Sequence, residues 1–249
     1  GTNEYPTMID ERGLSVLPIS SLSLDYPVST ERVSSGIDEL DAMLGGQGYY
    51  RGTTVLVSGA AGTGKSSIAT AFAAGICRQG QRFLYLTYEE APEQILRNMR
   101  SIGCDLRPWV RKGLLHFHAV RSSLYGLEQH LVNIHKQIDE FRPAAMVIVP
   151  VSNLLGIGEQ REVKAMVTRM IDYLKNQGIT TLFTTLTEAE HAEEQSEAGI
   201  SSLIDTWLLL RNAETSGERN RLLFILKSRG MAHSNHVREF LLTNDGIQL

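Results

Sequence analysis

The chain has 249 residues, with 24 Lys and Arg against 28 Asp and Glu, and 42% of its residues are hydrophobic. The formal net charge of −4 argues against nucleic acid as the main partner, because neutralising phosphates requires a concentration of Lys and Arg. No apolar run approaches the roughly 20 residues that span a bilayer. Two cysteines, Cys77 and Cys104, do not make a disulfide framework, so we expect a soluble cytoplasmic α/β protein.

The first 30 residues differ from the rest of the chain. Residues 4–16, EYPTMIDERGLSV, and residues 239–249, EFLLTNDGIQL, share one plan, in which Gly13 matches Gly246. Each has an apolar strand, a polar pair, a glycine and an apolar residue. A domain whose last strand recurs before its own start indicates excision from a tandem array. Two unrelated amphipathic hairpins would give the same pattern, so these residues alone leave both interpretations open.

From residue 53 the chain alternates strands and helices. Strands are predicted at 53–59, 82–88, 114–120, 144–151 and 179–186, and helices at 66–78, 92–102, 127–141 and 161–178. Three more strands, WLLLRN, RLLFILKSR and VREFLLT, then follow without helices between them. This order predicts a mostly parallel central sheet flanked by helices, with an antiparallel C-terminal edge.

A phosphate-binding loop is predicted at residues 59–66, GAAGTGKS, which match G-x-x-x-x-G-K-[ST] between a strand and a helix. Glycines let successive backbone N–H groups point inward, and the following helix adds its positive N-terminal dipole. In this motif the lysine reaches the β- and γ-phosphates and the last hydroxyl ligates Mg²⁺. We therefore predict a site for ATP and Mg²⁺ in which Ser66 is the metal ligand and the nucleotide contacts are Gly59, Ala60, Gly62, Thr63, Gly64, Lys65, Ser66 and Ser67.

Two acids, Glu89 and Glu90, stand at the end of the next predicted strand. In an open parallel sheet the carboxyl ends of the strands border the ligand crevice, where a carboxylate can act as general base. The alternative is an acidic helix start, favoured by the dipole and by the following Ala91-Pro92. That alternative accounts well for one glutamate and less well for both.

Three stretches carry a resemblance to a known family: residues 34–67, SSGIDELDAMLGGQGYYRGTTVLVSGAAGTGKSS, residues 88–105, YEEAPEQILRNMRSIGCD, and residues 226–233, LKSRGMAH. Together they resemble KaiC, the circadian-clock ATPase and autokinase of the RecA superfamily. The resemblance implies a RecA-like P-loop NTPase domain over residues 31–249. It also implies that residues 1–30 are the end of a preceding homologous domain plus a linker, as in the second half of a double-domain KaiC homologue.

The resemblance further implies a homo-hexameric ring with ATP between neighbouring subunits, and KaiA- or KaiB-like regulators as candidate partners. Lys227 and Arg229 would reach the nucleotide from the adjacent chain. A basic group supplied in trans to a phosphoryl transfer is worth roughly 10³–10⁵ in rate. The structural alternative for these two residues is an ordinary exposed strand end.

Residues 196–206, SEAGISSLIDT, resemble the place where the second KaiC half phosphorylates itself. The two acceptors would be Ser201 and Ser202, with Ser196 in the place of a nearby regulatory threonine. Glu89 would act as base toward the serine hydroxyl or toward water, with Glu90 assisting. The structural alternative for two serines before an apolar strand is an ST-turn.

One departure from the family lies in residues 144–151, AAMVIVPV, where Val149 occupies the place of the second acidic (Walker B) Asp. Valine cannot accept a hydrogen bond from a magnesium-bound water, so we expect slow serine autokinase and ATPase activity. The alternative function is a nucleotide-dependent oligomerisation module with little turnover. A RecA- or RadA-type recombinase would need basic DNA-binding loops, whereas the corresponding residues 188–199 are acidic.

Overall fold

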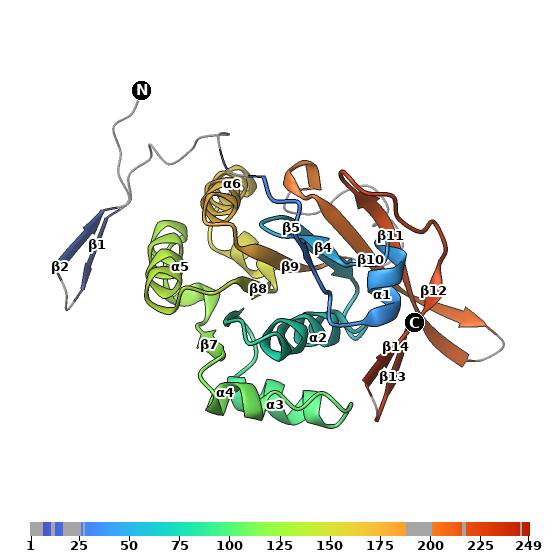
Figure 1. The fold of residues 1–249 in the computed structure, drawn as a ribbon. Coiled ribbons are helices and arrows are strands. Elements are labelled where there is room, and N and C mark those ends of the chain that lie inside the picture. Colours follow the sequence, from blue (N-terminus) through green and yellow to red (C-terminus); the bar gives the residue numbers. More distant parts are fainter. Residues whose placement is uncertain are drawn as a thin grey trace.

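A mostly parallel sheet forms the middle of the computed structural model, which describes residues 7–10, 13–16, 26, 28–187, 201–215, 218–244 and 246–249 (Figure 1). All strands from β10 to β7 run parallel, and β11 and β12 are antiparallel to their neighbours. In spatial order the eight strands are β12 (Arg238–Glu239), β11 (Glu218–Ser228), β10 (Thr206–Thr215), β5 (Thr54–Gly59), β9 (Thr180–Leu186), β8 (Ala145–Val149), β6 (Phe83–Thr87) and β7 (Leu115–Ala119). The predicted fold class is thus confirmed.

Helices cover both faces of the sheet (Figure 1). They are α1 (Asp38–Met43), α2 (Lys65–Arg78), α3 (Pro92–Arg100), α4 (Arg107–Arg111), α5 (Leu127–Phe141) and α6 (Gln160–Asn176). Successive strand side chains point to opposite faces. Val55 and Val57 of β5 join the buried cluster that contains the apolar side of α2, whereas Leu56 joins the cluster of α5 and α6. Among the described residues, none of the helices combines the length and apolarity that crossing a membrane requires.

The remaining elements are short. They are the strand pairs β1 (Thr7–Asp10) with β2 (Gly13–Val16), β3 (Arg32–Val33) with β4 (Tyr49–Tyr50), and β13 (Leu241–Thr243) with β14 (Gly246–Gln248), and the 3₁₀ turns η2 (Ser122–Leu124), η3 (Val151–Gly156) and η4 (Ser201–Leu203). Helix α5 has the predicted bounds, and the other predicted helices and the strands through β9 differ from the structure by at most a few residues.

Two expectations for the C-terminal strands need correction. WLLLRN lies in β10, which pairs antiparallel with β11 as expected but also lies parallel beside β5, so the antiparallel edge begins at β11. The single strand predicted for VREFLLT is wrong, because the chain leaves the sheet between β12 and β13. Phe240 at this break is fully buried against Gly64, and its N–H donates to the Arg221 carbonyl at 2.7 Å. Burial of one aromatic ring therefore overrides continuous strand pairing.

The hairpin β1–β2 and the hairpin β13–β14 have the same register. Ile9 pairs with Leu14 in the first, and Leu242 pairs with Ile247 in the second. In each, the second strand begins at a glycine with positive φ. They differ in burial: Ile9 and Leu14 are 81% and 66% exposed, whereas Leu242 and Ile247 pack against the main core. The N-terminal hairpin thus presents an apolar cross-strand pair to solvent.

A close backbone contact fixes the helix that follows the phosphate loop. Gly36 has a φ of 84°, and a Cβ added there would lie 1.9 Å from the carbonyl oxygen of Ala71 in α2. The buried Asp41 holds this turn by accepting bonds from the Ser34 hydroxyl at 2.6 Å and the Ser35 N–H at 2.8 Å. The segment before α1 therefore lies directly against the α2 backbone.

We predict that Gly36→Ala destabilises the domain much more than Gly46→Ala. Both glycines have positive φ, but a Cβ on Gly46 meets no atom within 4 Å. Gly46→Ala should cost about 1–2 kcal/mol, the price of a left-handed conformation for a residue with Cβ. Gly36→Ala should cost about 3 kcal/mol or more, because the α2 backbone must also shift. Denaturant unfolding of both variants measures the difference, and equal losses would contradict the contact.

Candidate nucleotide site

The phosphate loop lies between two buried elements. Every residue of β5 is buried, and the chain turns at Gly59 into the loop and enters α2 through Gly64, whose φ is 100°. Within the described residues, no acceptor is bonded to the N–H groups of Gly62, Gly64 or Lys65. Such N–H groups at the start of a 14-residue helix favour an anion through their partial charge. The loop therefore fits a phosphate group.

Lys65 contributes the buried positive charge of this loop. Its side chain is 9% exposed, and Nζ donates to the carbonyls of Gly59 and Ala60 at 2.7 Å each. Burial lowers the pKa of Lys65 to about 8, and the Glu89 carboxylate acts in the opposite direction. No described carboxylate forms an ion pair with this ammonium. A phosphate would supply the anionic partner that the neutral carbonyls do not.

Glu89 and Glu90 follow β6 at the same edge of the sheet, but they have different surroundings. Glu89 is exposed, and its charge reaches Lys65. Glu90 is half-buried, and its backbone exchanges hydrogen bonds with the Thr87 hydroxyl at 3.1 and 3.2 Å. Burial, and then the Glu89 charge, raise the pKa of Glu90, and the Glu90 charge acts on Tyr85 in the core. Glu89 is therefore the carboxylate better placed to serve the phosphate loop.

Val149 ends β8 beside these glutamates. It is paired with Thr87 in the sheet and is 7% exposed, and its carbonyl accepts the Tyr88 N–H at 2.9 Å. Its side chain offers no oxygen. Asp139 lies in the last turn of α5, where it accepts the Tyr173 hydroxyl at 2.9 Å, so it belongs to the opposite end of β8 and cannot replace the missing acid.

The oxygen donors at the loop for Mg²⁺ are few. Ser66 supplies a half-buried hydroxyl at the start of α2, and Glu89 and Glu90 supply carboxylates nearby. No group of three His, Cys, Asp or Glu side chains gathers as a metal site in the part of the chain that the structure describes. This donor set suits an ion that takes much of its shell from water and phosphate, as Mg²⁺ does.

Three residues at the loop escaped the sequence analysis. Arg221 of β11 donates from Nε to the Gly62 carbonyl at 3.2 Å, which places a cation on the rim of the loop. Phe240 supports Gly64, and the Trp207 indole N–H donates to the buried Ser58 hydroxyl at 2.7 Å. All three come from the last third of the chain. Their proximity depends on the strand order β12-β11-β10-β5, which no local pattern shows.

Lys227 and Arg229 lie with Ser201 and Ser202 at the opposite end of the strands from the phosphate loop. Lys227 Nζ donates to the Ser201 carbonyl at 2.7 Å, and an Arg229 Nη donates to the Ser202 carbonyl at 2.8 Å. The other predicted site residue in this segment, Ser196, lies outside the described residues. The structure thus brings the two candidate cations and the two candidate acceptors together.

This cluster is separated from the phosphate loop of its own chain. Gly59, where the loop begins, pairs with Leu210, whereas Ser228 pairs with Thr206, at the other end of β10. Four residues of strand correspond to roughly 13 Å. Lys227 and Arg229 flank Ser228 at this far end. One chain therefore carries the phosphate loop and the cluster of Lys227, Arg229, Ser201 and Ser202 at opposite ends of the strands of one sheet.

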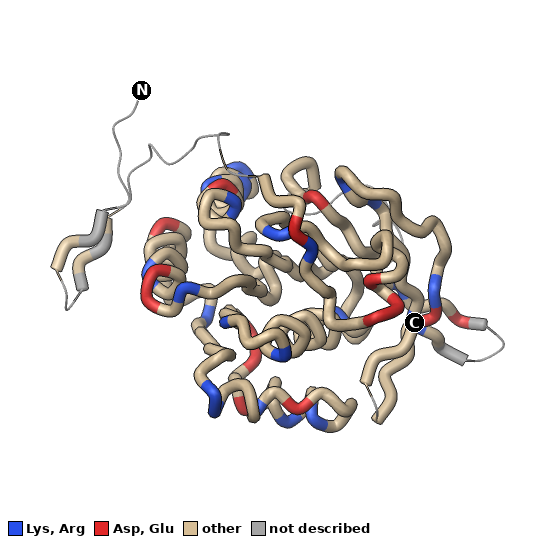
Figure 2. Tube along the Cα trace, viewed as in Figure 1, with Lys and Arg blue, Asp and Glu red and all other residues tan. Residues whose placement is uncertain are grey.

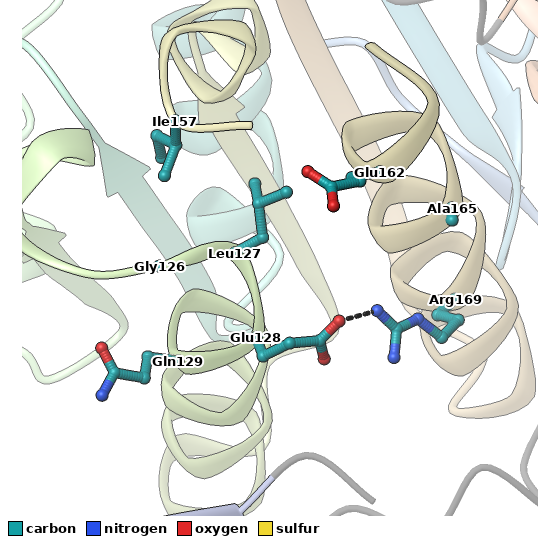
Figure 3. A pocket seen from close by; sticks show the side chains of 8 residues that line it. All are labelled: Gly126, Leu127, Glu128, Gln129, Ile157, Glu162, Ala165 and Arg169. Atoms are coloured by element: carbon teal, nitrogen blue, oxygen red, sulfur yellow. Dashed lines mark hydrogen bonds and ion pairs between the residues drawn. The ribbon is translucent and has the colours of Figure 1, made fainter. Parts of the chain in front are cut away.

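A separate hollow of about 430 Å³ lies between the start of α5 and α6 (Figure 3). The ion pair between Glu128 and Arg169 crosses it. Its lining consists of Gly126, Leu127, Glu128, Gln129, Ile157, Glu162, Ala165 and Arg169. No residue of the phosphate loop lines this hollow, so it is distinct from the candidate nucleotide site.

A glycine-rich loop between a buried parallel strand and a helix, in a sheet of this order, defines a RecA-like P-loop ATPase domain. A family model for the KaiC ATPase matches residues 33–249, and the chain belongs to the KaiC ATPase family.

Curated relatives of this chain include clock proteins of cyanobacteria. The circadian clock protein KaiC2 of Synechocystis sp. is 53% identical over 249 residues, covering 99% of this chain and 44% of that protein. The circadian clock oscillator protein KaiC of Parathermosynechococcus lividus is 36% identical over 247 residues, covering 99% and 46%. That of Synechococcus elongatus is 34% identical over 244 residues, covering 98% and 47%. The chain spans less than half the length of each of these relatives.

We predict that Lys65→Ala weakens ATP binding by about 10- to 100-fold, since a hydrogen bond to a charged group contributes about 1.5–3 kcal/mol. Lys227→Ala is the matched control, because it removes the same side chain at the far edge of the sheet. Titration with a fluorescent ATP analogue at protein concentrations too low for assembly measures both affinities. An equal loss of ATP affinity in the two variants would contradict the separation of Lys227 from the phosphate loop of its own chain.

Proposed function

We propose that this domain hydrolyses ATP and phosphorylates its own serines at interfaces between neighbouring chains. The separation of the phosphate loop from the cation–serine cluster, defined as Ser201, Ser202, Lys227 and Arg229, carries this proposal. A phosphoryl transfer needs both a bound triphosphate and groups that stabilise its transition state. One chain holds its phosphate loop and its cluster at opposite ends of the strands. A complete site therefore forms where the loop of one chain meets the cluster of the next.

In the proposed site the phosphate loop and Lys65 bind the β- and γ-phosphates, and the Ser66 hydroxyl holds Mg²⁺. The bound Mg²⁺ would neutralise charge on the transferring phosphoryl group. Glu89 takes the proton of a serine hydroxyl, whose oxygen forms the new bond to the γ-phosphorus as ADP departs. With water in place of serine, the same base gives hydrolysis to ADP and phosphate. Glu90, the half-buried neighbour of Glu89 in the chain, assists Glu89 as a second carboxylate.

Lys227 and Arg229 of the adjacent chain complete this site. Their positive charges would stabilise the charge that builds up on the transferring group, and Ser201 or Ser202 of the same adjacent chain would accept it. A contact between two different edges of identical chains is head-to-tail, so repeated contacts close into a ring when the rotation permits. A homo-hexamer with ATP at each interface is the assembly that we propose.

Val149 favours a second candidate function, a nucleotide-dependent oligomerisation module. Without an acidic side chain at this strand end, magnesium loses one outer contact, and turnover should be slow even where nucleotide binds well. ATP would then mainly join neighbouring chains. The presence of Glu89 and of the cation–serine cluster favours the enzyme over this second candidate.

DNA binding of the RecA or RadA type finds little support. Acidic and basic residues lie side by side on α3, α5 and α6 (Figure 2). The residues 188–199, which correspond to a DNA-binding loop, are rich in acids and lie outside the described residues. Non-specific nucleic-acid binding depends on a basic surface that neutralises phosphates. We therefore propose a protein-only assembly, with KaiA- or KaiB-like regulators as further partners in the cytoplasm.

Residues 1–30 are proposed to be the end of a preceding homologous domain and its linker. The hairpin β1–β2 repeats the register of the domain's own last hairpin, and its apolar pair Ile9 and Leu14 is exposed here. Coverage of less than half of the relatives' length is consistent with this. In a double-domain protein the exposed pair would pack on the preceding unit, as Leu242 and Ile247 pack on this one.

We predict that phosphorylation occurs between chains. A Lys65→Ala chain keeps its serines, and a chain with Ser201→Ala and Ser202→Ala keeps its phosphate loop. When the two are mixed with γ-labelled ATP and magnesium, the label should appear on the Lys65→Ala chain, at Ser201 or Ser202. Mass-tagged chains and peptide mapping identify the labelled protein and residue.

The same mixture separates the possible failures. Each variant incubated alone should remain unlabelled, which serves as the control. Label on the wild-type chain but none in the mixture would contradict transfer between chains. Bound ATP without label on any chain would remove the autokinase and leave the oligomerisation module.

We predict that Val149→Asp raises ATP turnover by about tenfold or more, the scale on which outer contacts to a metal act. Val149→Asn is the matched control, because it has the same shape as Asp without the charge. Both variants are measured for turnover at saturating ATP and magnesium, with thermal unfolding to confirm folding. Equal turnover in the two variants would show that the missing acid does not limit the rate.

A further inference from the structure

Asp205 joins the cation–serine cluster to the strand that carries the phosphate loop. It lies between η4 and β10, and its carboxylate accepts the Thr54 N–H and the Thr54 hydroxyl at 2.9 Å each. The same carboxylate pairs with Lys175 Nζ at 2.9 Å. The Lys175 and Asp205 side chains are only 11% and 15% exposed, so this ion pair is far less screened than a surface pair.

The backbone of Asp205 bonds to Thr54 as well, and also to Arg229. Its N–H donates to the Thr54 carbonyl at 3.0 Å, and its carbonyl accepts the Arg229 N–H at 2.8 Å. Thr54 is the first residue of β5, whose last residue is Gly59. Asp205 therefore bonds directly to the start of the phosphate-loop strand and to the end of β11.

The cluster is crowded with positive charge, and among the described residues the Asp205 carboxylate pairs with Lys175 and acts on Lys227. Burial, the Arg229 guanidinium and the Lys175 ammonium all lower the pKa of Lys227, whereas the Asp205 carboxylate raises it. Removing that carboxylate would leave three cations, Lys175, Lys227 and Arg229, repelling one another. Lys227 and Arg229 are the residues whose side chains hold the Ser201 and Ser202 carbonyls. The Asp205 charge thus acts on Lys227, one of the two side chains that hold the serine carbonyls.

We propose that Asp205 is a positioning residue that presents the two serines and the two cations to the neighbouring chain as one preformed unit. The inference rests on the proposed function and adds to it the residue that aligns the second half of the site. Asp205 does not contact the nucleotide in this proposal. It acts through its charge on Lys227 and through its hydrogen bond to the Arg229 N–H. Because it also bonds to Thr54, it fixes the cluster in register with the phosphate loop of its own chain.

The test is Asp205→Asn in the full chain, which keeps the shape of the side chain and removes its charge. Turnover should fall roughly 10- to 100-fold, as expected when groups in a phosphoryl-transfer site are displaced by about 1 Å. ATP affinity at low protein concentration should stay within about twofold of the original, because the loop lies at the far edge. Unchanged turnover would overturn the proposal.

Mixed assemblies distinguish positioning from a general loss of structure. Chains with Asp205→Asn keep a sound phosphate loop, and chains with Lys65→Ala keep a sound cluster, so their mixture should recover turnover that neither shows alone. A folded Asp205→Asn chain that joins the assembly without recovery would overturn the proposal. If Asp205→Asn fails to fold, Lys175→Met decides: a loss that Lys65→Ala chains complement supports the proposal, and no loss overturns it.

Two further variants complete the design. Asp139→Asn changes a carboxylate of α5 that accepts the Tyr173 hydroxyl and not a bond from the cluster, so it should leave turnover unchanged; an equal loss there would overturn the assignment to Asp205. Arg229→Ala mixed with Lys65→Ala tests the proposed function itself. If this mixture fails to recover turnover, the proposal that a neighbouring chain completes each site is wrong. If this mixture recovers turnover and the Asp205→Asn mixture does not, only the positioning role of Asp205 is wrong.

Discussion

The parallel pairing of β10 with β5 is the constraint on which the account of this domain depends. It aligns Gly59 with Leu210 and Val55 with Thr206, so the phosphate loop and the cation–serine cluster occupy opposite ends of the same pair of strands. Both ends are buried and hydrogen-bonded, and neither can approach the other without breaking the sheet. Under the proposed function, these are two half-sites that face different neighbouring chains, and assembly is part of the chemistry.

Electrostatics differ sharply between the two halves. At the loop, Lys65 is desolvated and bonded to neutral carbonyls, with the exposed Glu89 near enough to act on it. At the opposite end of the strands, Asp205 pairs with Lys175 and its charge acts on Lys227. The phosphate loop suits a polyanionic ligand, and the cation–serine cluster carries positive charges that such a ligand would attract. Val149 adds no charge to the phosphate loop, so we propose that its effect falls on the rate and leaves the fold and the nucleotide contacts in place.

Local signals in the sequence predicted much of the fold. The apolar spacing of 127–141 gave the bounds of α5, and the glycine-rich motif located the turn between β5 and α2. The place of β10 beside β5 was not predictable, because it depends on contacts between residues about 150 apart in the chain. Arg221 and Phe240 reach the loop only through that strand order. The roles of Glu89, Lys227, Arg229, Ser201 and Ser202 stay predictions, although their positions are now known.

The dependence of specific ATPase activity on protein concentration tests the central claim most directly. If each site is completed by a neighbouring chain, turnover per chain should be low when the protein is dilute and rise to a plateau as chains assemble. The rise should coincide with assembly measured by light scattering under the same conditions. A turnover per chain that is constant from the monomer to the assembled state would contradict a site built from two chains.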